Sequence, residues 1–273
     1  MAMNSIVVPI YKPFESLGQE ERISLHQLYR VMRDHEIILI GPVGFDFSLY
    51  KAHAESFGVG VHVKTFGADF FIGIDGYNKL LLSRQFYRAF LQFEYILIYQ
   101  TDAYVFKDDL DFWCKQGYDY IGAPWFDGYG YATEGGKFIG VGNGGFSLRK
   151  VKSYLKVMST FRYIVTPSVL WKEFLKNPGI RQSLSLIAKL TFRNNSFSRF
   201  SKVIENEDIY WGMVVPSRFP WFKVPDMQTA SQFAMEVNAP LLYKQNNSQL
   251  PFGCHKWDIY TPAFWEPFIQ IEQ

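Results

Sequence analysis

Residues 95–106 (YILIYQTDAYVF) decide the fold. The first five, 95–99, form an unbroken apolar run, and the polar residues Gln100, Thr101 and Asp102 follow it directly. A short apolar run bounded by a polar turn predicts a strand that is buried on both faces of a parallel sheet. Ligands of open parallel sheets bind beyond the carboxyl ends of the strands, so we expect chemistry at the polar residues that follow this run.

On the amino-terminal side of this run, strand patterns and helix patterns alternate. Apolar runs at 5–10 (SIVVPI) and 36–40 (EIILI) predict strands, and a further short strand is expected at 61–66. Apolar residues recur at helical spacing over 17–33 and 78–93. This alternation predicts an α/β fold in which helices flank a mostly parallel central sheet.

On the carboxyl-terminal side the patterns are more varied. YDYIGA at 118–123 predicts another strand, and an aromatic, glycine-rich loop is expected at 124–142. Extended structure resumes at 144–148, and a helix is expected at 150–161. Segment 177–202 is basic and punctuated by Ser and Asn. It is either a solvated helix and loop or a surface that contacts anionic lipid or a phosphate-bearing acceptor.

Length and composition limit the class of protein. The 273 residues allow one large α/β domain or two small ones, and the content of 48% apolar and 20% charged residues excludes intrinsic disorder. A formal charge of +2 is too balanced for a nucleic-acid-binding protein, so no nucleic acid partner is expected. The two cysteines, Cys114 and Cys254, argue against a disulfide framework or a zinc finger and for a reducing compartment. We find no signal-peptide pattern and no apolar stretch of the ~20 residues that a spanning helix needs, and therefore expect a soluble or at most membrane-associated protein.

Four polar clusters each follow an apolar run, and each has an ordinary structural interpretation. Asp102 could be a helix cap or turn former, and Asn143 with its neighbouring glycines could form a tight turn. Glu207 and Asp208 could be first-turn acids of a helix, and His255 could have a purely structural role. Taken singly the clusters identify no site, whereas their order along the chain does carry information.

That order resembles the GT-A class of nucleotide-sugar-dependent glycosyltransferases. In this class a strand that ends in D-x-D binds a divalent cation bridging the diphosphate of the donor, and residues 95–106 resemble that strand. Gln100 stands in place of the first Asp, and Asp102 matches the second, which usually touches the metal. The Q-T-D variant and the G-C-H-K-W element at 253–257 are also similar to those of an uncharacterised glycosyltransferase-like group.

Two later segments imply further metal and donor contacts. FGCH at 252–255 resembles an F-x-x-H element whose histidine completes the metal site, so the resemblance implies Asp102 and His255 as metal ligands. VGNGGFSLR at 141–149 is similar to the glycine-rich segment beneath the donor sugar. It implies donor contacts at Asn143, Gly144 and Gly145, because backbone without side chains lets a sugar ring approach closely.

The EDIYWG segment at 207–212 resembles the E-D-x-y-x-G segment of inverting members. The resemblance implies Asp208 as the general base for the acceptor hydroxyl, with Glu207 as the second candidate. A positioned carboxylate contributes roughly 10²–10⁴-fold to such a proton transfer. A hard cation neutralises the charge that develops on a leaving diphosphate, and an imidazole ligand such as His255 favours Mn²⁺ over Mg²⁺.

Additional residues are assigned to the two substrates. Residues beside the predicted strand ends and at the start of the 78–93 helix are assigned to the nucleotide donor: Pro9, Tyr11, Lys12, Asn78, Lys79, Thr101 and Lys256. Aromatic residues suited to stacking on sugar rings are assigned to the acceptor: Trp125, Phe126, Trp257, Tyr129 and Tyr131. Asp127, which directly follows Phe126, is assigned to the acceptor with them. Each assignment has an ordinary alternative. Tyr11 and Lys12 could simply form a strand-to-loop junction, Lys79 could be an exposed helix lysine, and the aromatic rings could pack in the core.

We therefore expect a single GT-A domain over 1–273, with a nucleotide-binding half at 1–122 and an acceptor-binding half at 123–273. The expected reaction is inverting, divalent-metal-dependent transfer from a UDP-sugar to a hydroxyl of a glycan or lipid-linked glycan, as in polysaccharide or O-antigen assembly. We expect a cytoplasmic protein with 177–202 as a peripheral contact at the inner membrane face. The alternatives are a retaining transferase or nucleotidyltransferase on the same fold, or a non-catalytic carbohydrate-binding protein with a decayed site.

Overall fold

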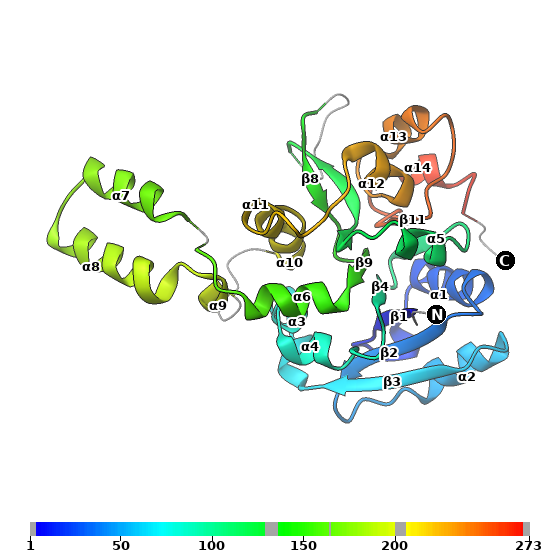
Figure 1. Ribbon diagram of the computed structural model, residues 1–273. Coiled ribbons are helices and arrows are strands. Elements are labelled where there is room, and N and C mark those ends of the chain that lie inside the picture. Colours follow the sequence, from blue (N-terminus) through cyan, green and yellow to red (C-terminus); the bar gives the residue numbers. More distant parts are fainter. Residues whose placement is uncertain (1–3, 129–135, 164, 200–205, 270–273) are drawn as a thin grey trace.

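The computed structural model describes residues 4–128, 136–163, 165–199 and 206–269. A six-stranded sheet lies at its centre between helices (Figure 1). The elements of the first half are β1 (Asn4–Pro9), α1 (Gln19–Val31), β2 (Glu36–Pro42), α2 (Ser48–Ser56), β3 (Val61–Phe66), α3 (Gly73–Leu81), α4 (Arg84–Arg88), β4 (Tyr95–Tyr99), β5 (Ala103–Val105), α5 (Leu110–Lys115) and β6 (Tyr120–Ile121), with short 3-10 turns at Phe14–Ser16 and Ala68–Phe71.

The second half begins with a two-stranded hairpin and continues mainly as helices. Its elements are β7 (Ala123–Phe126), β8 (Phe138–Gly142), β9 (Phe146–Lys150), α6 (Val151–Ser159), α7 (Pro167–Lys176), α8 (Ile180–Ala188), a π-helical turn (Lys189–Arg193), α9 (Ser196–Arg199), α10 (Glu207–Ile209), the π-helix η5 (Tyr210–Val214), α11 (Val215–Arg218), α12 (Met227–Phe233), β10 (Ala234–Met235), α13 (Ala239–Gln245), β11 (Gly253–His255) and α14 (Pro262–Trp265).

The central sheet has the strand order β3-β2-β1-β4-β9-β6. β1 pairs in parallel with both β2 and β4, and β2 pairs in parallel with β3. β9 is antiparallel to both of its neighbours, β4 and β6. The predicted α/β fold with a mostly parallel central sheet is therefore confirmed, and β4 lies in the middle of the sheet as its unbroken apolar run indicates.

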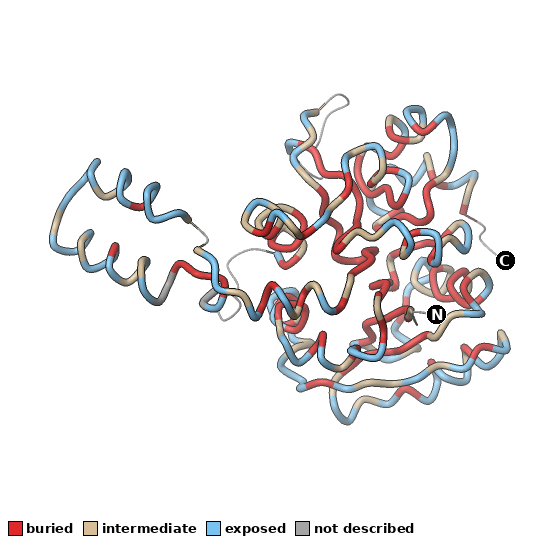
Figure 2. The backbone as a smooth tube through the Cα atoms, viewed as in Figure 1, coloured by how far each residue is buried: buried red, intermediate tan, exposed pale blue. Residues whose placement is uncertain are grey.

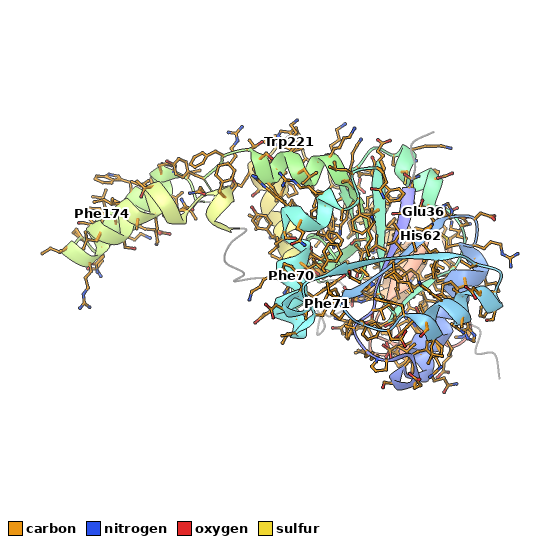
Figure 3. The ribbon with its side chains drawn as sticks, turned by 90° about the horizontal axis from the view of Figure 1, so that it is seen from below. Glu36, His62, Phe70, Phe71, Phe174 and Trp221 are labelled. Carbon is orange, nitrogen blue, oxygen red and sulfur yellow. The ribbon has the colours of Figure 1, made fainter. Side chains whose placement is uncertain are left out.

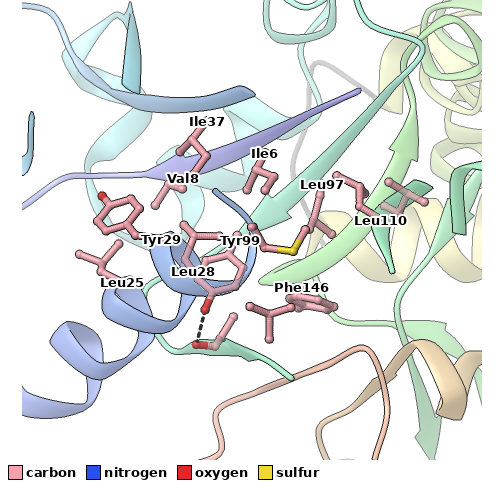
Figure 4. Close-up of a cluster of buried hydrophobic side chains, with 14 of the residues drawn as sticks. Ile6, Val8, Leu25, Leu28, Tyr29, Ile37, Leu97, Tyr99, Leu110 and Phe146 are labelled. Carbon is pink, nitrogen blue, oxygen red and sulfur yellow. Dashed lines mark hydrogen bonds between the residues drawn. The ribbon is translucent and has the colours of Figure 1, made fainter. Parts of the chain in front are cut away.

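Alternate side chains of the central strands are buried in two separate cores. Ile6 and Val8 of β1 pack with Leu28 and Tyr29 of α1 in the first core (Figure 4). The intervening Val7 packs with the other core, on the side of α3, α4 and α6. Because successive strand side chains point to opposite faces, an all-apolar strand needs a helical layer on each side.

Two expectations from the sequence are corrected by the structure. The helix expected at 78–93 is two helices, α3 and α4, because Ser83 ends one and caps the next, its hydroxyl accepting a hydrogen bond of 3.1 Å from the amide of Phe86. The strand expected at 118–123 and the loop expected at 124–142 are instead the short strand β6 followed by the hairpin β7–β8. The aromatic residues Trp125 and Phe126 therefore lie on a paired strand and not in the expected loop.

A second, three-stranded sheet has the order β10-β11-β5. β5 begins one residue after Asp102, and it pairs antiparallel with β11, so that Ala103 lies opposite His255. This register brings the Q-T-D segment and the late histidine to the same place, although they are far apart in the chain.

A helical hairpin made of α7 and α8 extends away from the body of the molecule (Figure 1). The structure thus places residues 177–188 of the basic segment in an extension whose residues are largely exposed (Figure 2). Within the part of the chain that the structure describes, no helix combines the length and apolarity needed to cross a membrane.

The EDIYWG segment folds as one continuous helical stretch through α10, η5 and α11. Gly212 lies where η5 meets β8, and a Cβ atom at this position would lie 1.8 Å from the carbonyl oxygen of Val141. The glycine is thus needed for the close approach of helix and strand, independently of any ligand.

Gly212→Ala is expected to lower the free energy of unfolding by at least about 1–3 kcal/mol, because the added methyl group forces η5 away from β8. Urea unfolding followed by circular dichroism measures this. The matched control is Gly60→Ala, an exposed site where a Cβ meets nothing within 4 Å. Equal stability of the two variants would contradict the proposed packing constraint.

Candidate functional site

A cavity of about 470 Å³ lies beyond the carboxyl ends of β1 and β4. This is the edge at which open α/β sheets bind ligands. The residues that line it come from both halves of the chain: Tyr11, Phe71, Gly73, Ile74, Tyr77, Asn78, Gln100, Gly144, Gly145, Asn206, Glu207, Asp208, Glu236, His255 and Lys256. Its volume is within the range of small-molecule sites.

His255 is the centre of a chain of polar contacts at this cavity. Its Nε2 atom lies 3.1 Å from Asp102 Oδ1 and 3.3 Å from Gln100 Oε1. Its Nδ1 atom lies 2.8 Å from Glu236 Oε1, and the other oxygen of Glu236 accepts a hydrogen bond of 2.9 Å from the indole of Trp125. The imidazole orientation is therefore fixed from both sides by buried or half-buried groups.

The two carboxylates determine the charge of this imidazole. Burial by itself lowers the pKa of His255, but the facing carboxylates of Asp102 and Glu236 outweigh burial and raise it to about 9. For Asp102, burial by itself raises the pKa, but the facing imidazolium of His255 outweighs burial and the net shift of the pKa is downward. Without a metal, His255 is therefore protonated at neutral pH and paired with two carboxylates.

The spacing of these groups fits a divalent cation. Ligands in adjacent positions of an octahedral site with bonds of about 2.1 Å lie about 3 Å apart, as the contacts of His255 Nε2 with Asp102 and Gln100 do. Glu236 holds Nδ1, which leaves Nε2 as the ligand atom once its proton has left. The described residues contain no group of three or more His, Cys, Asp or Glu side chains arranged for a metal. The amide of Gln100 and ligand oxygens would have to complete the coordination.

Glu207 and Asp208 have different surroundings, although they are adjacent in sequence. Both oxygens of Glu207 accept hydrogen bonds from the Arg149 guanidinium, at 2.7 and 2.9 Å, and both side chains are buried. Burial raises the pKa of Glu207 to about 7, while Arg149 acts in the opposite direction. This carboxylate is committed to an internal ion pair, so the structure gives it a positioning role.

Asp208 remains available to a ligand in the cavity. Its Oδ2 atom accepts a hydrogen bond of 3.0 Å from the Gly144 amide, and its Oδ1 atom accepts one of 2.9 Å from the amide of Ile209. These bonds orient the carboxylate without neutralising it. Burial raises its pKa above the ordinary value, which moves it toward that of an effective base near neutral pH.

The glycine-rich segment fits closely between these two groups. A Cβ atom at Gly145 would lie 2.0 Å from His255 Nε2, and one at Gly144 would lie 2.5 Å from Glu207 Oε1. Asn143 has a φ of 76°, and its side-chain oxygen accepts hydrogen bonds from the amides of Gly145 and Phe146. The two glycines are therefore needed for close packing within the protein itself, apart from the donor sugar to which the resemblance assigns them. Asn143 forms the tight turn that was the alternative interpretation.

Some residues assigned to the donor make contacts within the protein. Lys12 pairs with Glu21 at 2.5 Å, and Thr101 donates a hydrogen bond of 2.9 Å to the same carboxylate. Asn78 reaches the cavity, and its side-chain oxygen accepts a hydrogen bond of 3.2 Å from the amide of Glu207. Pro9 is buried in β1, and Lys79 is exposed on α3. Tyr11 and Lys256 do line the cavity.

The aromatic rings assigned to the acceptor are placed differently from the expectation. Trp125, Phe126 and Trp257 are only 4%, 3% and 8% exposed. Trp125 and Phe126 lie on the paired strand β7, and Trp257 packs in the same hydrophobic cluster as Phe126. Asp127 is exposed at the end of β7. Tyr129 and Tyr131 lie outside the described residues.

Sequence reasoning missed Glu236, which contacts His255, and Arg149, which pairs with Glu207. Glu236 directly follows β10, a strand of two residues, and no pattern around it indicates a polar site. Arg149 lies within the quoted VGNGGFSLR segment, where an arginine directly after Phe146, Ser147 and Leu148 could have indicated a buried acidic partner.

One family model matches the chain. The family model described as "Protein of unknown function (DUF5672)" matches residues 60–255, which include most of the residues described above. No curated protein matches the chain.

Several solved structures are similar to it. The glycosyltransferase GlyE of Streptococcus pneumoniae TIGR4 is 13% identical with a TM-score of 0.46; the match covers 99% of this chain and 61% of that one. Mouse xyloside xylosyltransferase 1 in its apo form is 10% identical with a TM-score of 0.49, and the match covers 93% and 97% of the two chains. The mannosyltransferase PcManGT from Pyrobaculum calidifontis, in complex with GDP-Man and Mn²⁺, is 14% identical with a TM-score of 0.38, over 59% of this chain and 48% of that one.

Glu207→Gln is expected to destabilise the protein by about 3–5 kcal/mol, because it leaves the guanidinium of Arg149 buried without its counter-charge. Urea unfolding measures the loss. Asp208→Asn is the matched control: it keeps the size of the side chain and one acceptor oxygen, so a loss of about 1 kcal/mol is expected. If Asp208→Asn is the more damaging change, the assignment of the two acids is wrong.

Proposed function

The chain belongs to the family described as "Protein of unknown function (DUF5672)", and we propose that it is a glycosyltransferase that inverts the anomeric centre of its donor. The reaction would move a sugar from a nucleotide donor to an acceptor hydroxyl. One observation carries the proposal: His255, whose Nε2 atom contacts Asp102 and Gln100 at a spacing that fits a cation, lines the same cavity as Asp208, a half-buried carboxylate that accepts hydrogen bonds from the amides of Gly144 and Ile209.

The two groups are joined by consecutive residues. Gly145 lies against His255, and Gly144 donates its amide hydrogen to Asp208. A diphosphate bound beside Asp102 and His255 would therefore hold its sugar over the glycines, with the anomeric carbon toward Asp208. This order, from cation to phosphate to sugar to base, is the one that direct displacement at an anomeric carbon requires.

The chemistry follows from these positions. A Mn²⁺ or Mg²⁺ ion held by Asp102, His255 and Gln100 would neutralise the charge of the departing diphosphate. Asp208 takes the proton of the acceptor hydroxyl while that oxygen forms its bond to the anomeric carbon and the carbon–phosphate oxygen bond breaks. The amides of Gly144 and Ile209 keep the carboxylate oriented for this transfer.

The donor is proposed to be a UDP-sugar, with the ring of Tyr11 as the stacking surface for the base. Tyr11 is 58% exposed at the cavity, and its pKa is raised by burial of its hydroxyl and by the nearby charge of Asp102. Lys256 lines the same cavity and supplies positive charge for phosphate. The proposed acceptor is a glycan or lipid-linked glycan, and a cytoplasmic location is retained as a prediction. The division into halves at residue 122 also remains a prediction.

One observation favours a second candidate, a carbohydrate-binding protein that lacks activity. His255 already has two carboxylate partners, and a neutral amide occupies the position of the first acid. In such a site the protonated imidazole of His255 already balances the charge of its carboxylate partners, so no cation is required. Calorimetry with and without Mn²⁺ therefore separates the two candidates.

Asp208→Asn is expected to lower sugar transfer at least 10²-fold, because an amide cannot accept the proton of the acceptor hydroxyl. Binding of the nucleotide should stay near that of the unaltered protein, because Asp208 is hydrogen-bonded to the amides of Gly144 and Ile209 and is not one of the proposed cation ligands. Product formation measured by chromatography and nucleotide binding measured by calorimetry give the two values. Unchanged sugar transfer in this variant would show that Asp208 is not the base.

The pH profile provides an independent check. A base works only when ionised, so transfer should fall as the pH drops through the pKa of Asp208, and burial places this fall above the usual range of an aspartate. The anomeric configuration of the product, read from NMR coupling, decides between the proposed inversion and a retaining reaction. Release of a diphosphate nucleotide, as opposed to pyrophosphate, excludes a nucleotidyltransferase.

Asp102→Ala is expected to abolish the Mn²⁺-dependent part of UDP binding, because it removes the carboxylate oxygen beside His255 Nε2. Titration calorimetry with UDP, in the presence and absence of Mn²⁺, measures it. Asp127→Ala is the control, an exposed aspartate that does not line the cavity. Identical heats for the two variants would favour the carbohydrate-binding candidate. A panel of nucleotide sugars, scored by slow hydrolysis without acceptor, then identifies the sugar.

A further inference from the structure

The helical hairpin of α7 and α8, with the turn that joins them, is here called the arm (residues 167–188). It extends from the body, and most of its surface is exposed (Figures 1 and 2). Within the arm, Leu170 and Leu186 are buried and Phe174 is half-buried, so these side chains hold the two helices together. Figure 3 shows Phe174 on the arm, well away from the central sheet.

The arm leaves large apolar side chains in solvent. Five of them are more than half exposed: Trp171 (53%), Leu175 (58%), Ile180 (83%), Leu184 (64%) and Ile187 (59%). Two helices of 10 and 9 residues that bury so little of their apolar surface gain little from the hydrophobic effect in water. Grouped apolar side chains of this kind mark an interaction surface.

Helical geometry places these five side chains on one side of the arm. On α7, Trp171 and Leu175 are one turn apart and lie beside the buried contact face. On α8, Ile180, Leu184 and Ile187 are spaced by four and three residues, so they form a single stripe. In both helices the stripe is displaced from the buried contact by about a quarter turn in the same rotational sense. Because the helices are antiparallel, equal displacement puts both stripes on the same side.

The charges of the arm indicate what this side would meet. Between Glu134 and Glu205 the chain contains one acid, Glu173, while the arm and the residues after it carry Lys172, Lys176, Arg181, Lys189 and Arg193. Glu173 is two residues from both Trp171 and Leu175, which places it on the opposite side of α7. The apolar side is therefore flanked by cations and turned away from the acid.

We propose that the arm is a peripheral membrane anchor whose apolar side lies in the headgroup region of an anionic lipid surface. A Trp residue, branched aliphatic residues and flanking Lys and Arg are the composition of interfacial helices. An apolar protein partner would explain the stripe but not the excess of cations, and anionic headgroups account for both. The proposal rests on the arm alone and is independent of the reaction proposed above.

The test is sedimentation of the full chain with vesicles. Vesicles of phosphatidylcholine with phosphatidylglycerol should bind the protein, vesicles of phosphatidylcholine alone should bind it at least tenfold less, and added salt should release it. The triple variant Ile180→Ser, Leu184→Ser, Ile187→Ser and the triple variant Lys172→Gln, Lys176→Gln, Arg181→Gln should each bind at least tenfold more weakly. Circular dichroism and urea unfolding check that the body of each variant remains folded.

The matched control removes three exposed apolar side chains outside the arm: Val43→Ser, Leu91→Ser and Ile259→Ser. This variant should bind vesicles like the unaltered protein. Equal binding to both kinds of vesicle, undiminished binding by the arm variants, or an equal loss in the control would each overturn the proposal. So would a lipid-free dimer in light scattering that becomes monomeric in the Ile180/Leu184/Ile187 variant, because the apolar side would then be an interface between two copies.

Discussion

The buried ion pair of Arg149 and Glu207 links the parts of the molecule on which the site depends. Arg149 lies on β9, the strand that runs against its neighbours, and Glu207 opens the helical stretch that carries Asp208. The guanidinium also contacts Tyr87 and the carbonyl oxygen of Gly144, so that sheet, helix and glycine-rich turn share one centre. Buried pairs contribute less to net stability than their charges suggest, and their main effect here is to allow one arrangement of these elements. Because Arg149 holds Glu207 in place, the neighbouring carboxylate of Asp208 is oriented toward the cavity.

The other side of the cavity is organised by backbone pairing. The β5–β11 register sets the distance between Asp102 and His255, and Glu236 with Trp125 behind it fixes the ring. Each functional group thus has a second residue that restrains it: Glu236 for the imidazole, and the amide of Gly144 for Asp208. Preorganised polar groups of this kind need little rearrangement when charge develops on a bound ligand.

The sequence predicted best where one local pattern decided the outcome. The runs that became β1, β2 and β4 are apolar on both faces, and short apolar runs of this kind are typical of buried strands. The contact of Asp102 with His255, and the presence of His255 and Asp208 at one cavity, were also expected, although this expectation came from the order of short motifs and not from periodicity. The contact of Glu236 with His255, its hydrogen bond from Trp125 and the close contacts of the two glycines could not be predicted, because each depends on a partner that no local pattern identifies, from 19 residues away for Glu236 and His255 to 111 for Trp125 and Glu236. The basic segment was noticed for its charge, whereas its apolar side becomes visible only when α7 and α8 are paired.

The pairing of β5 with β11 also bears on how the protein acquires its site. Asp102 and His255 belong to opposite ends of a long stretch of chain, and closing so large a loop is slow compared with forming the local contacts of the amino-terminal strands and helices. The acid and the imidazole meet only after the last strand has docked, when the remainder of the sheet is already in place. A ribosome-bound or truncated chain that ends before residue 253 would therefore contain a folded sheet without a complete ligand site, and competence for binding would arrive with the final stage of folding.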